Sequence, residues 1–236
     1  MKQSYSSGVA FIFEGDTEQT FYEILISQFS GKHPEYSYTV SFDDAVNEVI
    51  SESSCESHSV IIRMNSVKTI SQVTHSADWF NNSCKKKNPS IKWTVFLCYD
   101  TDSHLADITK FYEGDWLTLR RKLKGKKIEV IDLASRAMIE DILLYDKEGI
   151  CNYLEIPNQT IPREGNGKTT LKQFYRKFGK AYHEGERASD MIWGLDMALI
   201  VANAEIQLHL VEERCFPFVQ IIRDNPDGVE QSIQKT

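Results

Sequence analysis

The first 135 residues alternate short apolar runs with amphipathic stretches, and this alternation constrains the fold more than any other feature. Residues 9–13 (VAFIF) and 94–99 (TVFLCY) are continuous apolar runs, which is typical of strands buried on both faces of a sheet. Further strands are predicted at 38–42, 60–64 and 128–131, with helices at 17–29, 43–52, 66–82 and 112–123. Strands that alternate with helices form crossover units, so we expect an α/β fold with a mainly parallel sheet flanked by helices.

The pattern changes after about residue 135 and becomes helical. The sequence predicts helices at 137–145, 169–182, 188–199 and 202–214, and a loop at 156–167 that holds two prolines and two glycines. We therefore expect a catalytic α/β domain over residues 1–147 and a helical C-terminal extension over residues 148–236.

Composition narrows the class of protein. Among 236 residues, 27 Lys and Arg face 34 Asp and Glu, for a net charge of −7, which excludes a uniformly basic surface for nucleic acid but allows local basic patches. No apolar run approaches the roughly 18–20 residues that cross a bilayer. The 5 cysteines contain no CxxC pair, so neither a zinc ribbon nor a disulfide framework is expected. These features predict a soluble cytoplasmic protein that does not bind membranes.

Acidic residues follow the two most apolar strands. Glu14 comes after the run at 9–13, and Asp100 and Asp102 come at the end of the run at 94–99. The carboxyl ends of parallel strands face the crevice where ligands bind, so adjacent strands would bring these carboxylates together. Converging carboxylates repel one another unless a hard cation joins them, and Mg²⁺ (or Mn²⁺) suits their oxygens. The alternative is that such acids only stabilise helix N-termini.

The segments Phe11–Glu18 (FIFEGDTE) and Phe96–Asp102 (FLCYDTD) together resemble the Toprim domain. The form of the first motif is similar to that of bacterial OLD- and RloB-like phage-defence nucleases, and to Toprim effectors of two-component abortive-infection systems such as PARIS. The resemblance covers about residues 8–147.

The resemblance implies a Mg²⁺-dependent endonuclease with a defined set of site residues. Glu14 would be a general acid or base or a metal ligand, and Asp100 and Asp102 would hold the metal. In similar proteins a helix with a glutamate follows a small polar turn, which makes Glu140 a further metal ligand, with Asp141 as second choice. The alternative for this helix is an ordinary solvated acidic face.

Two basic segments stand out against the acidic total. Residues 120–127 (RRKLKGKK) hold six cations and no acid, and Arg120 and Arg121 are candidate nucleic-acid contacts. A second group of candidate contacts lies on the helix predicted at 169–182 or at its start: Lys168, Lys172, Arg176 and Lys180. Three of these recur every fourth residue and so form one stripe, which suits phosphate contacts. The alternative is a solvated helix face over core aromatic residues.

Residues 167–170 (GKTT) do not form a Walker A motif, because position 162 is proline where the motif needs glycine. Any ATPase would therefore be a separate subunit, and a homodimer is left open. The predicted function is a nuclease acting on DNA or RNA, tRNA included, as the toxic effector of an anti-phage system. The alternatives are a non-catalytic Toprim-fold interaction subunit and a phosphotransfer enzyme with Asp100 as nucleophile.

Overall fold

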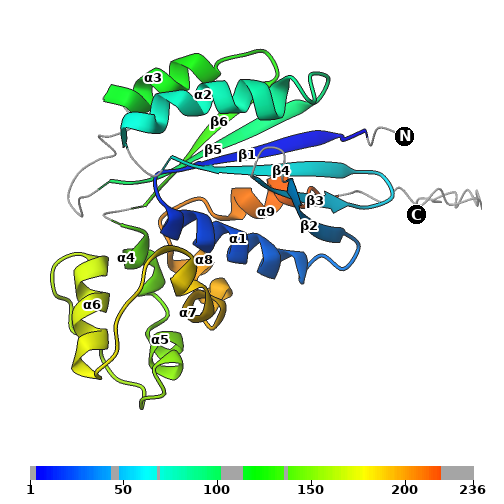
Figure 1. Ribbon diagram of the computed structural model, residues 1–236. Coiled ribbons are helices and arrows are strands. Elements are labelled where there is room, and N and C mark those ends of the chain that lie inside the picture. Colours follow the sequence, from blue (N-terminus) through cyan, green and yellow to red (C-terminus); the bar gives the residue numbers. More distant parts are fainter. Residues whose placement is uncertain (1–3, 44–47, 68–69, 102–113, 136–137, 219–236) are drawn as a thin grey trace, which may run out of the picture.

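A six-stranded sheet forms the centre of the protein (Figure 1). The computed structural model describes residues 4–43, 48–67, 70–101, 114–135 and 138–218. The strand order is β2-β3-β4-β1-β5-β6. The strands are β1 (Ser7–Phe13), β2 (Ser37–Asp43), β3 (Glu48–Ser54), β4 (Ser59–Ser66), β5 (Lys92–Asp100) and β6 (Ile128–Ser135).

Strand β1 lies at the centre and pairs in parallel with both β4 and β5, and β6 continues the parallel part. Strands β2 and β3 add an antiparallel edge. The expectation of an α/β fold with a mainly parallel sheet is confirmed. Gly8 of β1 has a steric role here, because a Cβ atom at this position would lie 2.6 Å from the ring of Trp93 on β5.

The helix expected at 43–52 is wrong. Asp43 is the last residue of β2, and residues 48–52 belong to strand β3, which pairs with β2 on one side and β4 on the other. Ser51 and Ser53 are buried in it and Ser53 donates a hydrogen bond to the carbonyl of Cys215. The fit of a segment between two strands outweighs local periodicity in such a position.

Helices cover both faces of the sheet (Figure 1). One face carries η1 (Ile70–His75), α2 (Ser76–Trp79), η2 (Phe80–Lys85) and α3 (Gly114–Leu123), and the other carries α1 (Asp16–Ser30) and α9 (His209–Cys215). Successive residues of β1 alternate between the two cores: Phe11 and Phe13 pack toward α1, and Ile12 packs toward α2 and α3. Each such buried side chain stabilises the fold by about 1.5–3 kcal/mol.

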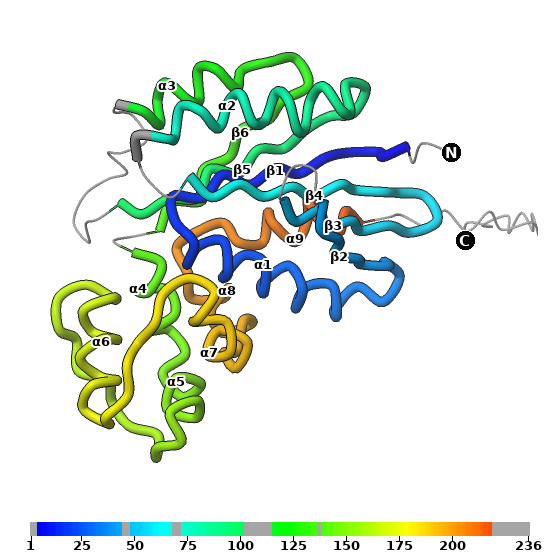
Figure 2. Tube along the Cα trace, viewed as in Figure 1, coloured from blue at the N-terminus to red at the C-terminus, as the bar shows by residue number. Residues whose placement is uncertain are grey.

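The chain after β6 is helical, as expected. Its elements are α4 (Ile139–Leu143), α5 (Lys147–Tyr153), α6 (Gly167–Lys177), η4 (Gly185–Ala188), α7 (Ser189–Trp193), α8 (Met197–Asn203) and α9. Figure 2 shows that α4 to α8 gather beyond one end of the sheet, below the end of β1 and beside α1. Side chains of this part, such as Leu171 and Phe174, share one hydrophobic core with Phe11 of β1. The predicted domain boundary between residues 147 and 148 stays a prediction.

The helices differ in detail from those expected. The stretch 188–199 is divided between α7 and α8, because Asp196 caps a new helix by accepting a hydrogen bond from Leu199 N at 3.0 Å. Helix α5 was not expected. No helix among the described residues has the length and apolar character needed to cross a membrane.

Candidate active site

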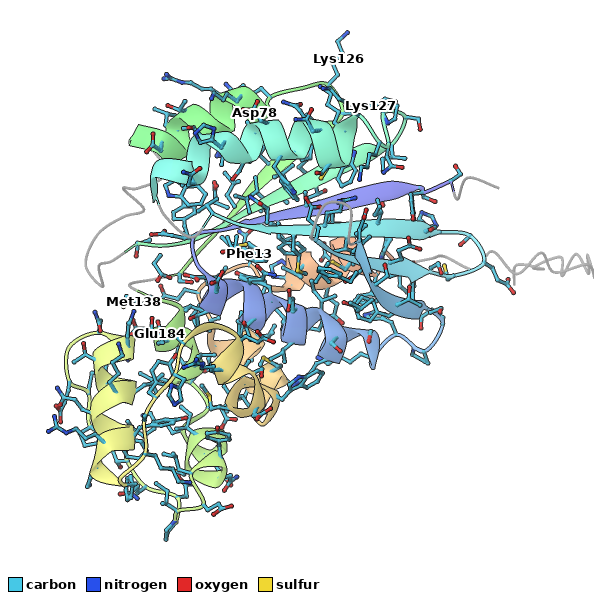
Figure 3. The ribbon with its side chains drawn as sticks, viewed as in Figure 1. Phe13, Asp78, Lys126, Lys127, Met138 and Glu184 are labelled. Atoms are coloured by element: carbon cyan, nitrogen blue, oxygen red, sulfur yellow. The ribbon has the colours of Figure 1, made fainter. Side chains whose placement is uncertain are left out.

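A cavity of about 340 Å³ opens at the carboxyl ends of β1 and β5. Six carboxylate side chains line it, from four parts of the sequence, and Lys168 lies among them. The lining residues are Glu14, Gly15, Asp16, Thr17, Glu18, Asp100, Met138, Ile139, Glu140, Lys168, Glu184 and Gly185. In Figure 3 the labels of Phe13, Met138 and Glu184 mark the surroundings of this cavity, which we call the carboxylate pocket.

The pairing of β1 with β5 brings Glu14 and Asp100 together. Glu14 N donates to the carbonyl of Cys98 at 3.0 Å, so the pairing continues one residue beyond β1. The Glu14 Oε2 atom then accepts a hydrogen bond from Asp100 N at 3.3 Å. Asp100 is 8% exposed, and Glu14 is half-buried at the pocket wall. Adjacent central strands therefore place both acids at one site.

Glu18 is a functional candidate that the sequence argument missed. It lies in the first turn of α1 and is 6% exposed. Burial raises the pKa of its carboxyl to about 7; its own backbone N–H lowers the pKa, and the charges of Glu140 and Glu14 add to the rise. In the sequence, the available signal was the position of Glu18 four residues after Glu14, with Gly15 between them. In the structure, Gly15 lies close to this carboxylate, because a Cβ atom on Gly15 would lie 2.9 Å from Glu18 Oε2.

Asp16 lies in the first turn of α1 and does not cap this helix with its side chain. The N-cap is Gly15, which has no side chain to accept a hydrogen bond. The Asp16 Oδ1 atom instead accepts from the hydroxyl of Ser66 at 2.8 Å, which ties the start of α1 to the end of β4.

Glu140 faces the pocket, whereas Asp141 has a structural role. The Asp141 Oδ2 atom accepts from Met138 N at 3.1 Å, and Oδ1 accepts from Arg163. Glu140 is 3% exposed and accepts a hydrogen bond from the Tyr182 hydroxyl at 3.2 Å. Burial raises the pKa of Glu140, while its own backbone N–H, Lys168 and Tyr182 oppose the rise.

Gly167 allows α6 to approach the turn that carries Glu140. A Cβ atom on Gly167 would lie 2.6 Å from the carbonyl carbon of Glu140. This close contact sets Lys168 of α6 beside the acids. The GKTT segment thus serves as a packing point and not as a nucleotide loop.

An acidic side chain holds the cations at the mouth of the pocket. The Glu184 carboxylate binds Lys168 Nζ at 2.5 Å and Lys172 Nζ at 2.8 Å. The hydrogen bond with Glu184 raises the pKa of Lys168 and burial opposes this rise, while the charges of Glu184, Glu140 and Asp100 raise the pKa further. Lys168 therefore belongs to the carboxylate pocket.

The other predicted nucleic-acid contacts lie away from this pocket. Lys180 Nζ donates to the carbonyl of Leu154 at 2.9 Å, and Arg176 lines a separate groove along α6. On α3, Arg120 binds Asp132 at 3.1 Å and Arg121 is exposed. The two predicted basic segments are thus not one surface around the acids.

A divalent cation is only partly supported by the described residues. Carboxylate oxygens are the ligands that Mg²⁺ prefers, and the pocket supplies them. Yet the described part of the chain contains no three His, Cys, Asp or Glu side chains placed to hold one metal ion. Asp102, the predicted second ligand, lies outside the described residues.

No protein-family model and no curated protein matches the sequence. Among solved structures, the futalosine hydrolase of Helicobacter pylori strain 26695 matches with a TM-score of 0.27 at 7% identity, over 83% of this chain and 94% of that chain. The 5'-methylthioadenosine/S-adenosyl homocysteine nucleosidase of Campylobacter jejuni matches with a TM-score of 0.26 at 11% identity, over 80% and 100%. The first is named as a hydrolase and the second as a nucleosidase.

The Toprim prediction is wrong. The similar structures are named as futalosine hydrolases and as a nucleosidase, none as a Toprim nuclease, and no family model matches. The endonuclease activity on DNA or RNA and the toxic anti-phage role, which the resemblance implied, are corrected with it. The resemblance depended on acids after two strands, and any open parallel sheet with a ligand site at its carboxyl edge favours such residues.

Proposed function

We propose that the chain is a hydrolase and that the carboxylate pocket is its active site. The observation that supports this is the convergence of acids that lie after β1, at the end of β5 and in α4 around one cavity at the carboxyl edge of the sheet. Ligand sites of open α/β sheets lie at this edge. Buried acids cost stability, because burial and mutual repulsion disfavour their charge, and such a cost is typical of functional sites.

Glu18 is the proton donor in this proposal. With a pKa of about 7, a large fraction of its carboxyl is protonated at neutral pH, and a general acid works best with a pKa near the working pH. Glu14 lies at the same pocket and supplies a second carboxylate. Hydrolases that cleave acetal bonds use such a pair, one acid to protonate the leaving group and one carboxylate to support the developing cation or activate water.

The substrate class that fits this pair is a small glycoside, with nucleosides included. The described pocket lining contains neither a histidine nor a cysteine, so a Ser-His or Cys-His nucleophile finds no support there. Glycosidic cleavage needs no such group, because its transition state resembles an oxocarbenium ion and two carboxylates suffice. The volume of about 340 Å³ suits a small molecule.

The test is the release of reducing sugar from a panel of nucleosides and aryl glycosides. We expect Glu18→Gln to lower the rate by about 10²–10⁴-fold, the usual value of a general acid. Glu23→Gln is the matched control, since Glu23 lies on α1 outside the pocket lining and bonds Gln19. Failure of the wild-type protein to hydrolyse any glycoside, or an unchanged rate in Glu18→Gln, would overturn the proposal.

Several earlier expectations remain separate proposals. Binding of Mg²⁺ or Mn²⁺ by Asp100 and Asp102 is tested by calorimetry with the metal, comparing Asp100→Asn with the wild type. A homodimer or an ATPase subunit is tested by measuring the molar mass of the protein in solution and after co-purification. A cytoplasmic location agrees with the five cysteines, which are all free thiols.

A further inference from the structure

Two basic runs far apart in the sequence meet at the end of the sheet opposite the carboxylate pocket. Residues 85–92 (KKKNPSIK) hold four lysines, and residues 120–127 (RRKLKGKK) hold six cations; neither run contains an acid. One groove of about 150 Å³ is lined by Lys85 from the first run and by Lys126 and Lys127 from the second. We call the two runs together the lysine patch.

The fold explains this meeting. The first run leads from η2 into the start of β5, and the second leads from α3 into the start of β6. Since β5 and β6 are parallel neighbours, with Trp93 opposite Ile128, both runs arrive at the amino end of the sheet. Lys127 Nζ donates to the carbonyl of Ser90 at 2.6 Å and joins the runs directly.

The cations of the lysine patch mostly face solvent. Lys85, Lys124 and Lys126 are exposed, and among the described residues none of them has an ion pair. Figure 3 shows Lys126 extending away from the body of the protein. Three cations of the patch are paired with acids: Lys87 with Asp43 at 3.8 Å, Lys92 with Glu129 at 3.7 Å and Arg120 with Asp132 at 3.1 Å. A concentrated positive field therefore remains on a protein with a net charge of −7.

We propose that the lysine patch binds the phosphate backbone of a nucleic acid, as an anchoring surface separate from the carboxylate pocket. Lysine is a point-charge donor that contacts phosphate without reading bases. The large hydrophobic side chains found exposed among the described residues lie outside both runs, so the patch lacks the apolar anchor with which a peripheral surface enters a membrane. Charge complementarity thus favours nucleic acid.

The position of the lysine patch separates it from any chemistry at the pocket. Strand β5 begins at Lys92 and ends at Asp100, which at about 3.3 Å per residue spans about 26 Å. A phosphate bound at the patch therefore lies too far from the carboxylate pocket to contact its acids. The inference does not rest on the proposed hydrolase function.

The test measures binding of duplex DNA, single-stranded DNA and RNA over a range of salt concentrations. For the Lys85→Ala, Lys124→Ala, Lys126→Ala triple variant we expect weaker binding of all sequences. The log–log salt slope should become shallower by about 0.9 per lost contact on duplex DNA and about 0.7 on single strands. The control variant Lys32→Ala, Lys147→Ala, Arg187→Ala removes the same charge elsewhere and should bind as the wild type does. So should Glu18→Gln, which changes only the carboxylate pocket.

Three results would overturn the proposal. The first is a wild-type protein that binds none of the nucleic acids at low salt, and the second is an equal loss of binding in the patch and control variants. The third is stronger patch-dependent binding to phosphatidylserine vesicles or to polyglutamate than to nucleic acid, which would assign the lysine patch to a membrane or to an acidic protein.

Discussion

Replacing Glu18 with glutamine should make the protein more stable and less active, and the gain in stability should depend on pH. The carboxyl of Glu18 has a pKa of about 7 in the folded chain against an ordinary value of 4.5. The folded state therefore holds the proton more tightly than the unfolded state. The stability that this proton gives the folded state is complete below pH 4.5 and is lost as the pH rises through 7. Glutamine keeps the shape of the side chain and cannot ionise.

The magnitude follows from the two pKa values. The interval between 4.5 and about 7 corresponds to about 3 kcal/mol, at about 1.4 kcal/mol per pH unit. At pH 8 we expect Glu18→Gln to exceed the wild type in free energy of unfolding by up to this amount. At pH 4 the two proteins should differ little, because the wild-type carboxyl is then protonated in both states.

The assay is urea unfolding at several pH values between 4 and 8, followed by circular dichroism. The difference between variant and wild type removes the contribution of Asp132, whose pKa is also raised by burial. It contains the titration of Glu18 together with the interaction between Glu18 and Glu140. A difference that stays constant across this range would refute the reasoning, since it would mean that the Glu18 carboxyl does not change its charge between pH 4 and 8. If Glu18→Gln is more stable than the wild type and has lost hydrolysis, Glu18 serves function at the expense of stability. If the variant is less stable, Glu18 has a structural role.

Three further changes test the surroundings of the pocket. Gly167→Ala should destabilise the protein by about 1–3 kcal/mol, since its Cβ atom would meet the backbone of Glu140; thermal unfolding measures this. Tyr182→Phe should lower the free energy of unfolding by about 0.5–1.5 kcal/mol and raise the pKa of Glu140, because the variant lacks the hydrogen bond that stabilises the charged carboxylate. NMR titration of the Glu140 carboxyl measures this pKa. Lys168→Met should raise the pKa of Glu140 and that of Glu184, which both lose a cation; unchanged titration curves would remove Lys168 from the pocket.

The sequence determined those elements whose signal is local. The apolar runs at 9–13 and 94–99 became β1 and β5, because a continuous apolar stretch of this length is stable only when both faces are covered. Their acidic ends pointed to the carboxyl edge of the sheet, where the carboxylate pocket of the proposed site lies. The segment at 43–52 shows the limit, since its identity as strand β3 depends on pairing with β2 and β4, which lie elsewhere in the chain.

Only the tertiary structure decided which residues at this edge act together. Glu140 and Asp141 are adjacent and chemically alike in the sequence, and their roles separate because one faces Tyr182 in the pocket while the other binds Met138 N and Arg163. The raised pKa of Glu18 likewise arises from burial and from neighbours such as Glu140, which is more than a hundred residues away. Burial and electrostatic interactions depend on distance in space, so a carboxylate acquires its chemical character only when the chain has folded around it.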